Sequence, residues 1–285
     1  MRTSAVLLIS CPDQKGLVAT VSDFIFRHGG NILHTDEHTD AESVWFLMRV
    51  EFDPSGFDLP LGEFARYFDP IADRLGMEWR LTQPGERKRM IIMVSKYDHC
   101  LVDLLYRHKI GELRCEIPLV ISNHPDNQSI ADFYHIPFVV VPVTKNDKSE
   151  AERQQIALVR QNNADFIVLA RYMQVLSPQF VGMFPSGIIN IHHSFLPAFV
   201  GSKPYHQAFQ RGVKLIGATS HYVTEVLDDG PIIEQDVVRI SHRDSVEDLI
   251  QKGRDLEKVV LSRAVRWHID DRVLLYGDRK TVVFD

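Results

Sequence analysis

The sequence predicts an α/β protein in which a small domain precedes a larger one with a mostly parallel sheet. Residues 1–82 carry apolar patterns in the order strand, helix, strand, strand, helix, strand, the βαββαβ order of a ferredoxin-like unit. Residues 83–89 contain Pro, Gly and several charged side chains, a composition typical of a linker. In residues 90–285, apolar runs alternate with helical stretches, which is typical of a Rossmann-like, parallel sheet covered on both faces.

Each element of the first domain follows from the spacing of its apolar residues. Four strands are expected, over residues 4–10, 31–38, 43–52 and 77–81. The third strand alternates strictly through Val44, Phe46, Met48 and Val50, which indicates one buried face. Two helices are expected from helical spacing, with core-facing residues Leu17, Val21, Phe24 and Ile25 in the first and Leu61, Phe64, Phe68, Ile71 and Leu75 in the second.

The second domain is predicted from continuous apolar runs of strand length. These runs are Met90–Val94, Ile117–Ile121, Phe138–Val141, Phe166–Ala170 and Ile188–Ile191, and helices are expected between them near 98–108, 127–134, 149–163 and 177–183. Two longer strands follow, over Lys214–Val223 and Ile232–Ile240. The last helix is expected from Asp244 to His268, with a capping box of Ser245 and Asp248, before a closing hairpin around Gly277.

Composition disfavours several classes of partner. The chain of 285 residues has a formal net charge of −6, which argues against general binding to nucleic acid or to anionic membranes. No apolar run approaches the length of a membrane span. The three cysteines, Cys11, Cys100 and Cys115, form no CxxC pair, which favours a reducing compartment. We therefore expect a cytoplasmic protein with no nucleic-acid and no membrane partner.

A polar constellation late in the sequence predicts a catalytic site. Asn190 and His192 end an apolar run, and alternate residues of a strand point to the same side. They fall at the carboxyl edge of the predicted sheet, where open α/β sheets bind ligands. His221 lies in another strand and Asp228 lies in an acidic turn, so a carboxylate can orient an imidazole. An amide donor, an acid/base and its orienting group are what acyl transfer or hydrolysis requires.

The histidines do not predict a metal site. The sequence has no HExxH motif and no thiolate cluster, and the adjacent His192 and His193 would face opposite ways in a strand. No GxSxG elbow is present for a nucleophilic serine. We therefore expect no metal and no cofactor.

The first turn of the second domain, Ser95–Cys100, contains no glycine. A phosphate-binding turn needs backbone N–H groups directed inward, and glycines usually supply those backbone angles. Dinucleotide or phosphate binding is therefore not expected at this turn.

Residues 88–285 resemble the formyltransferase fold of enzymes that use 10-formyltetrahydrofolate. The resemblance rests on three segments that together match the active-site signature of that family: Asn190–Pro197, Gly217–His221 and Asp228–Gly230. It implies that Asn190 and His192 contact the formyl oxygen and that Asp228 holds His192.

The same resemblance implies a folate pocket. Its expected lining residues are Tyr172, Met173, Gln174, Val175, Leu176, Thr224 and Glu225. Four further side chains are expected to support or enclose the catalytic residues: His193, Lys203, His206 and His221. Of these, Lys203 and His206 belong to a segment expected to shape a lid over the attacking water.

Residues 6–82 resemble an ACT domain, a small module that often binds amino acids at dimer interfaces. The residues that stand where such effectors bind are Asp13, Gly16, Leu17, Asn31 and Ile32. The resemblance implies a homo-oligomer and a possible amino-acid effector, and it is equally compatible with a domain that serves only in assembly.

An ACT domain ahead of a formyltransferase-fold domain resembles the formyltetrahydrofolate deformylases. That resemblance implies hydrolysis of 10-formyltetrahydrofolate by water to tetrahydrofolate and formate, which would supply formate for purine synthesis and balance the one-carbon pool. His192 and Asp228 both remain candidates for the group that deprotonates the water. Two alternatives stay open: transfer of the formyl group to an amine acceptor, and a catalytically inert amino-acid sensor.

Overall fold

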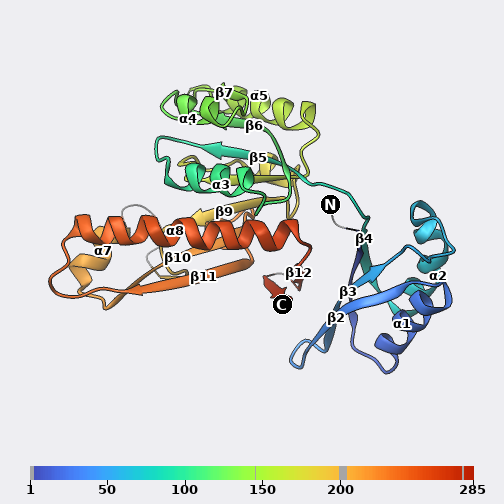
Figure 1. Ribbon diagram of the computed structural model, residues 1–285. Helices are drawn as coiled ribbons and strands as arrows, with labels where there is room; N and C mark the ends of the chain where they lie inside the picture. The colour runs from blue at the N-terminus through green and yellow to red at the C-terminus, as the bar shows by residue number, and fades with distance from the viewer. Residues whose placement is uncertain (1–2, 145, 199–203, 278) are drawn as a thin grey trace. The chain divides into compact units, whose positions relative to one another are not determined.

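The computed structural model describes residues 3–144, 146–198, 204–277 and 279–285. The chain forms two compact units, one of Met1–Glu86 with Asp270–Asp285 and one of Arg87–Ile269, and each is described by itself (Figure 1). No helix in the described ranges combines the length and the apolar character that a membrane span needs.

The N-terminal unit has the predicted order βαββαβ. Its elements are β1 (Ala5–Pro12), α1 (Leu17–Arg27), β2 (Asn31–Asp40), β3 (Trp45–Asp53), a 3-10 turn (Leu61–Glu63), α2 (Phe64–Leu75) and β4 (Glu78–Thr82). The strands form an antiparallel sheet in the order β2-β3-β1-β4. Both helices bury their predicted apolar faces against the side chains of one sheet face, including Ile9, Met48 and Phe52.

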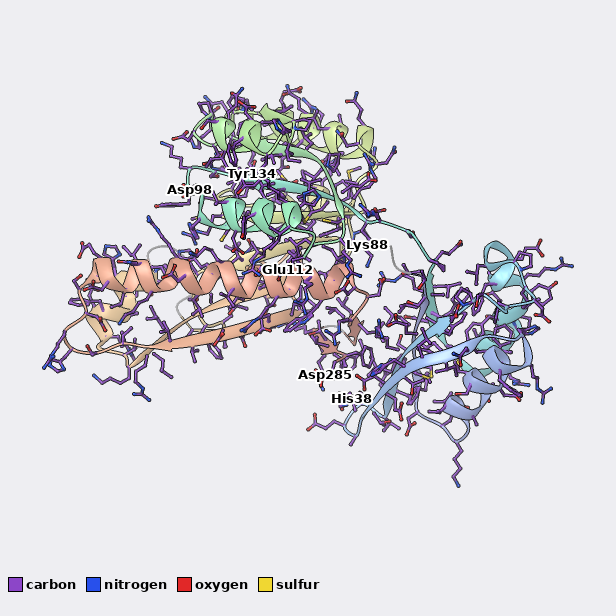
Figure 2. All side chains as sticks on the ribbon, in the orientation of Figure 1. His38, Lys88, Asp98, Glu112, Tyr134 and Asp285 are labelled. Carbon is purple, nitrogen blue, oxygen red and sulfur yellow. The ribbon has the colours of Figure 1, made fainter. Side chains whose placement is uncertain are left out.

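A C-terminal hairpin covers part of the other face of this sheet. It consists of β12 (Val273–Tyr276) and β13 (Lys280–Val283), and its apolar side chains, with Phe284, pack against Val6, Leu8 and Leu47. Polar contacts fix it in place: Arg49 Nε donates to the backbone oxygen of Asp271 at 3.0 Å. The backbone N–H of Asp285 donates to Asp36 of β2 at 3.1 Å. Figure 2 labels Asp285 next to the label of His38, which also lies in β2.

The position of this hairpin differs from the expected domain division. The sequence pattern predicts a second domain over residues 90–285, whereas the structure groups Asp270–Asp285 with the N-terminal unit. The physical reason is burial, because the hairpin covers Leu47 and Arg49, which lie on the face of β3 that strict alternation assigns to solvent. The turn residue Asp278 lies outside the described residues.

The second unit is a seven-stranded α/β sheet. In chain order it contains β5 (Arg89–Val94), α3 (His99–Lys109), β6 (Glu116–Ser122), α4 (Gln128–Phe133), β7 (Phe138–Val140), α5 (Lys148–Gln161), β8 (Phe166–Ala170), α6 (Pro178–Gly182), β9 (Ile188–His192), α7 (Pro204–Arg211), β10 (Leu215–Tyr222), β11 (Ile232–Arg239) and α8 (Val246–Ile269). The strand order is β11-β10-β9-β8-β5-β6-β7. The strands β5 to β9 are parallel, while β10 and β11 run antiparallel to their neighbours, so the expected mostly parallel sheet is confirmed.

Helices cover both faces of this sheet. One face packs against α5 and α6 through residues such as Val159 and Phe180. On the other face, α8 runs along β10 and β11 and contacts α3 (Figure 1). The predicted capping box begins α8, because the Ser245 backbone N–H donates to Asp248 at 2.8 Å and the Asp248 N–H donates back to the Ser245 hydroxyl at 3.2 Å. The parallel strands β5, β8 and β9 therefore direct their carboxyl ends to one edge, and the site lies there.

Candidate active site

Four polar side chains meet where β9 and β10 pair. Asn190 and His192 lie on β9, and His221 of β10 is the direct cross-strand partner of Asn190. Asp228 comes from the turn that follows β10, and its Oδ1 lies 3.3 Å from His192 Nδ1 and 4.0 Å from His221 Nε2. The structure thus brings together Asn190, His192, His221 and Asp228, as the sequence predicts.

His221 orients the amide of Asn190. Its Nδ1 lies 2.9 Å from the Tyr222 carbonyl oxygen, which can only accept, so Nδ1 carries the proton. Burial lowers the pKa of His221, so the ring is neutral and its Nε2 accepts a hydrogen bond from Asn190 Nδ2 at 3.2 Å. The Asn190 amide is therefore fixed, with its second N–H available for a ligand.

Asp228 orients His192. Burial raises the pKa of the Asp228 carboxyl, but the interactions with His192 and the other histidines outweigh burial, so its pKa lies below the ordinary value. The carboxylate accepts from the Nδ1–H of His192, which places the lone pair of the neutral ring on Nε2. That Nε2 is buried and has no hydrogen-bond partner among the described residues.

The turn that carries Asp228 is held tightly against β10. Asp228 itself has a φ of 55°, a left-handed conformation that Asp and Asn tolerate better than most residues. Two residues later, a Cβ at Gly230 would lie 1.7 Å from the Tyr222 carbonyl oxygen, so only glycine fits there. This close approach fixes the position of the carboxylate relative to β10.

These four polar side chains adjoin a cavity of about 310 Å³. All seven residues expected from the sequence to bind folate line it: Tyr172, Met173, Gln174, Val175, Leu176, Thr224 and Glu225. Asn190, His192, His221 and Asp228 line the same cavity. Its mixture of apolar walls and a few convergent polar groups is typical of a small-molecule site.

Comparisons with known proteins agree with this geometry. The family model described as formyl transferase matches residues 88–265. A formyltetrahydrofolate deformylase from Synechocystis sp. is 55% identical over 281 residues, covering 99% of this chain and 98% of that protein. The chain belongs to the formyltetrahydrofolate deformylase family.

Solved structures show the same relationship. A formyltetrahydrofolate deformylase from Pseudomonas syringae pv. tomato superimposes with a TM-score of 0.96 at 52% identity, covering 99% of this chain and 94% of that one. A glycinamide ribonucleotide transformylase from Symbiobacterium toebii reaches a TM-score of 0.66 at 27% identity, and covers 70% of this chain and 96% of that one. The deformylase therefore matches nearly the whole chain, whereas the transformylase matches only part of it.

The other expected supporting residues differ in their placement. His193 lines the cavity, and its ring centroid lies 5.3 Å from that of His192 and 6.0 Å from that of Tyr205. His206 is exposed on α7 and is not among the described residues that line the cavity. Lys203 lies outside the described residues. The predicted lid thus gains no support from His206.

Burial of His193 predicts a pH-dependent stability. Burial and the nearby Arg171 lower the pKa of His193 to about 3, below its ordinary value of 6.5. Between these two values the unfolded chain binds a proton that the folded protein does not, so the free energy of unfolding falls as pH is lowered from about 6.5 towards 3. We expect His193→Gln to reduce the loss of melting temperature between pH 7 and pH 4.5.

The exposed His242 supplies the matched control for this experiment. His242→Gln is expected to keep the wild-type dependence of melting temperature on pH. If His193→Gln keeps the wild-type dependence of melting temperature on pH, His193 does not contribute to that dependence.

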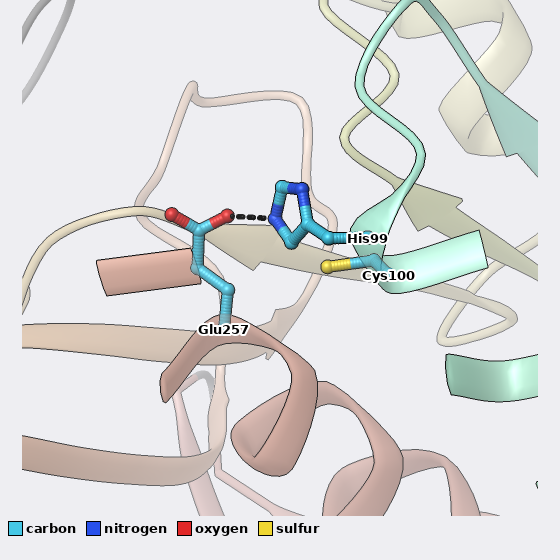
Figure 3. Close-up of side chains that lie close together, drawn as sticks. All are labelled: His99, Cys100 and Glu257. Atoms are coloured by element: carbon cyan, nitrogen blue, oxygen red, sulfur yellow. Dashed lines mark hydrogen bonds and ion pairs between the residues drawn. The ribbon is translucent and has the colours of Figure 1, made fainter. Parts of the chain in front are cut away.

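A second buried polar cluster lies beside the cavity, between α3 and α8. Figure 3 shows the His99 ring directed at the Glu257 carboxylate, with Cys100 next to it, and His99 Nε2 donates to Glu257 Oε2 at 2.7 Å. The Tyr205 hydroxyl donates to Glu257 Oε1 at 2.6 Å, and Arg171 Nε lies 3.3 Å from Oε2.

This cluster does not suit a metal ion. Both Glu257 oxygens already accept hydrogen bonds, and the Arg171 guanidinium next to them repels a second cation. Burial and the nearby Glu257 raise the pKa of the Cys100 thiol well above its ordinary value, so the thiolate that binds metals does not form. The donor set fits an internal ion-pair network instead.

The sequence pattern does not predict the cluster of Arg171, Tyr205 and Glu257. Signals were present in the sequence, because Arg171 interrupts an apolar strand end and Glu257 falls on the buried face of α8. Ionised side chains are almost never fully buried without a partner. What the sequence did not show was which partners these side chains reach.

The residues expected to bind an effector in the N-terminal unit are only partly available. Leu17 and Ile32 contribute to the apolar core of that unit. Asp13, Gly16 and Asn31 are exposed near the starts of α1 and β2. Gly16 has a φ of 90°, which favours glycine before the first turn of α1.

Proposed function

We propose that this protein hydrolyses 10-formyltetrahydrofolate to tetrahydrofolate and formate. The observation that carries the proposal is the group of Asn190, His192 and Asp228 in the wall of a cavity of about 310 Å³. Membership of the deformylase family supports the same reaction, since relatives with that name match nearly the full length of the chain.

In the proposed mechanism His192 is the general base. Its Nδ1–H is held by Asp228, and its buried Nε2 has no partner among the described residues, so Nε2 can accept a proton from the attacking water. Asp228 is the weaker candidate, because its lowered pKa makes its carboxylate a poor base. Asp228 therefore acts by orienting His192 and by stabilising the imidazolium that forms.

Asn190 stabilises the charge that develops on the formyl oxygen. One N–H of its amide is bound to His221, and the second is free to donate to the oxyanion of the tetrahedral intermediate. A donor of this kind contributes about 3–4 kcal/mol in enzymes that form similar intermediates. The His192 imidazolium then returns its proton to N10 as the C–N bond breaks, directly or through a water molecule.

The direct test is release of tetrahydrofolate and formate from 10-formyltetrahydrofolate with no acceptor other than water. Catalytic release of both products in equal amounts is expected. Folate binding without release, followed by release only after an amine is added, would show a formyltransferase and would overturn the proposal.

We further propose that the N-terminal unit is an ACT domain that promotes homo-oligomerisation and binds an amino acid. The βαββαβ order and the sheet order β2-β3-β1-β4 support this assignment. Calorimetric titration with each proteinogenic amino acid tests the effector, and the absence of binding would limit the unit to assembly. In the cytoplasm, the formate released would supply purine synthesis.

A further inference from the structure

Arg171 is an unusual residue of the cavity wall. It follows β8 directly, lines the cavity and is only 8% exposed. Its φ is 60°, a left-handed conformation that costs a non-glycine residue on the order of 1–3 kcal/mol. The chain therefore places a permanent positive charge beside the catalytic group at an energetic cost.

The guanidinium of Arg171 is held by a rigid frame. Its centre lies 5.2 Å from the centroid of the Tyr97 ring, and its Nε lies 3.3 Å from Glu257, which is 1% exposed. Tyr205 holds Glu257 and packs directly on α8, because a Cβ at Gly253 would lie 2.1 Å from the Tyr205 hydroxyl oxygen. This frame leaves the guanidinium little freedom to move.

One donor of Arg171 remains without a partner among the described residues. Nη1 is buried and makes no hydrogen bond to any of them, whereas Nε faces Glu257 Oε2 at 3.3 Å. A buried donor without a partner costs about 1–3 kcal/mol, and native proteins usually satisfy such groups with a bound ion or an ordered water. A small ligand that accepts a hydrogen bond from this guanidinium would remove that cost.

The positive charge of Arg171 favours an anionic ligand. Among the described residues that line the cavity, Arg171 is the only Lys or Arg, and it lies near enough to His193 to help lower the pKa of that ring. The proposed reaction forms an anion at this place. Water adds to the formyl carbon, the C–N10 bond breaks, N10 takes one proton, and the formic acid released loses another to become formate.

We propose that Arg171 binds a small carboxylate, the departing formate, beside the catalytic group. Guanidinium matches a carboxylate in shape and charge, and such charge-assisted hydrogen bonds are stronger than neutral ones. The inference rests on the proposed hydrolysis, because hydrolysis makes formate the product. The other carboxylate source is the glutamate tail of the folate itself, and the experiment separates the two.

The test is a titration of the full-length protein with [13C]formate, followed by NMR, at constant ionic strength with chloride as the balancing salt. We expect Arg171→Met to raise the Kd for formate about tenfold or more, because the variant loses one charge-assisted contact. Arg171→Lys keeps a positive charge near Glu257 but lacks the planar donor group, so a smaller, several-fold increase is expected. Product inhibition by formate in steady-state assays should weaken in the same order.

Arg254 supplies a matched control, since its guanidinium lies 5.7 Å from the same Tyr97 ring but its side chain is exposed. Arg254→Met removes one charge from the same neighbourhood and should leave the Kd for formate unchanged. A wild-type Kd in Arg171→Met, or no formate binding by the wild-type protein, overturns the proposal. If Arg171→Met does not fold, a folded Arg171→Lys variant with a wild-type Kd overturns it.

A donor without the glutamate tail, 10-formyltetrahydropteroate, distinguishes the two carboxylates. If Arg171 binds formate, Arg171→Met weakens formate inhibition equally with either donor. If Arg171 binds the tail, the variant raises KM for the folate donor alone and keeps a wild-type Kd for formate, which overturns the proposal. Failure of the hydrolysis itself would appear separately, as no formate release by the wild-type protein.

Discussion

Replacement of His192 by Asn is expected to lower kcat by about 10²–10⁴-fold, the usual contribution of a general acid–base. The amide nitrogen of Asn can take the place of His192 Nδ1 and keep the contact with Asp228, which lies 3.3 Å away in the native site. What the variant loses is Nε2, the buried nitrogen without a partner among the described residues. The change therefore removes the proton acceptor and leaves the rest of the site in place.

The measurement pairs single-turnover rates of formate release with the Kd for tetrahydrofolate from fluorescence titration. The rate should fall while the Kd changes only a few fold, because the seven cavity residues expected to bind folate are untouched. His242→Asn, which alters an exposed histidine before α8, should keep the wild-type rate. A rate in His192→Asn within threefold of the wild type would exclude His192 as the base.

The fold was predictable wherever local pattern decides burial. The parallel strands β5, β6, β8 and β9 appear as apolar runs because helices cover both of their faces. The short helix α7 was not predicted, because its few buried positions, Pro204, Tyr205 and Ala208, are too few for a clear helical period. The surface that the C-terminal hairpin covers was not predicted either, because local sequence does not specify which surface an amphipathic hairpin covers.

The residues of the candidate site could be predicted only in part. Asn190 and His192 were placed together by the two-residue period of a strand, and that period is a local property. Asp228 was a candidate because of its acidic turn, but its contact with His192 was implied only by the family resemblance, because a turn residue can point in many directions. The contact of Arg171 with Glu257 depends on the packing of α8 beside the end of β8, and no pattern within either segment encodes that distance.

Replacement of Asp228 by Asn is expected to lower kcat by about 10²–10⁴-fold while the turn keeps its conformation. Asn is nearly isosteric with Asp and tolerates the φ of 55° at this position, so the backbone should not change. The variant loses the negative charge that stabilises the imidazolium, and its amide can donate to Nδ1 and so favour the wrong tautomer of His192. An analogous Asp-to-Asn change in a Ser-His-Asp triad costs about 10⁴-fold for this reason.

The decisive measurement is a double-mutant cycle of His192→Asn and Asp228→Asn on the rate of formate release. If Asp228 acts only through His192, the double variant should be no slower than His192→Asn alone, because residues that act as one unit are strongly non-additive. Asp229→Asn, which removes the same charge one residue later, should cause a much smaller loss. Multiplicative effects of the two changes would instead mean that Asp228 acts on the water independently, and the assignment of His192 as sole base would be wrong.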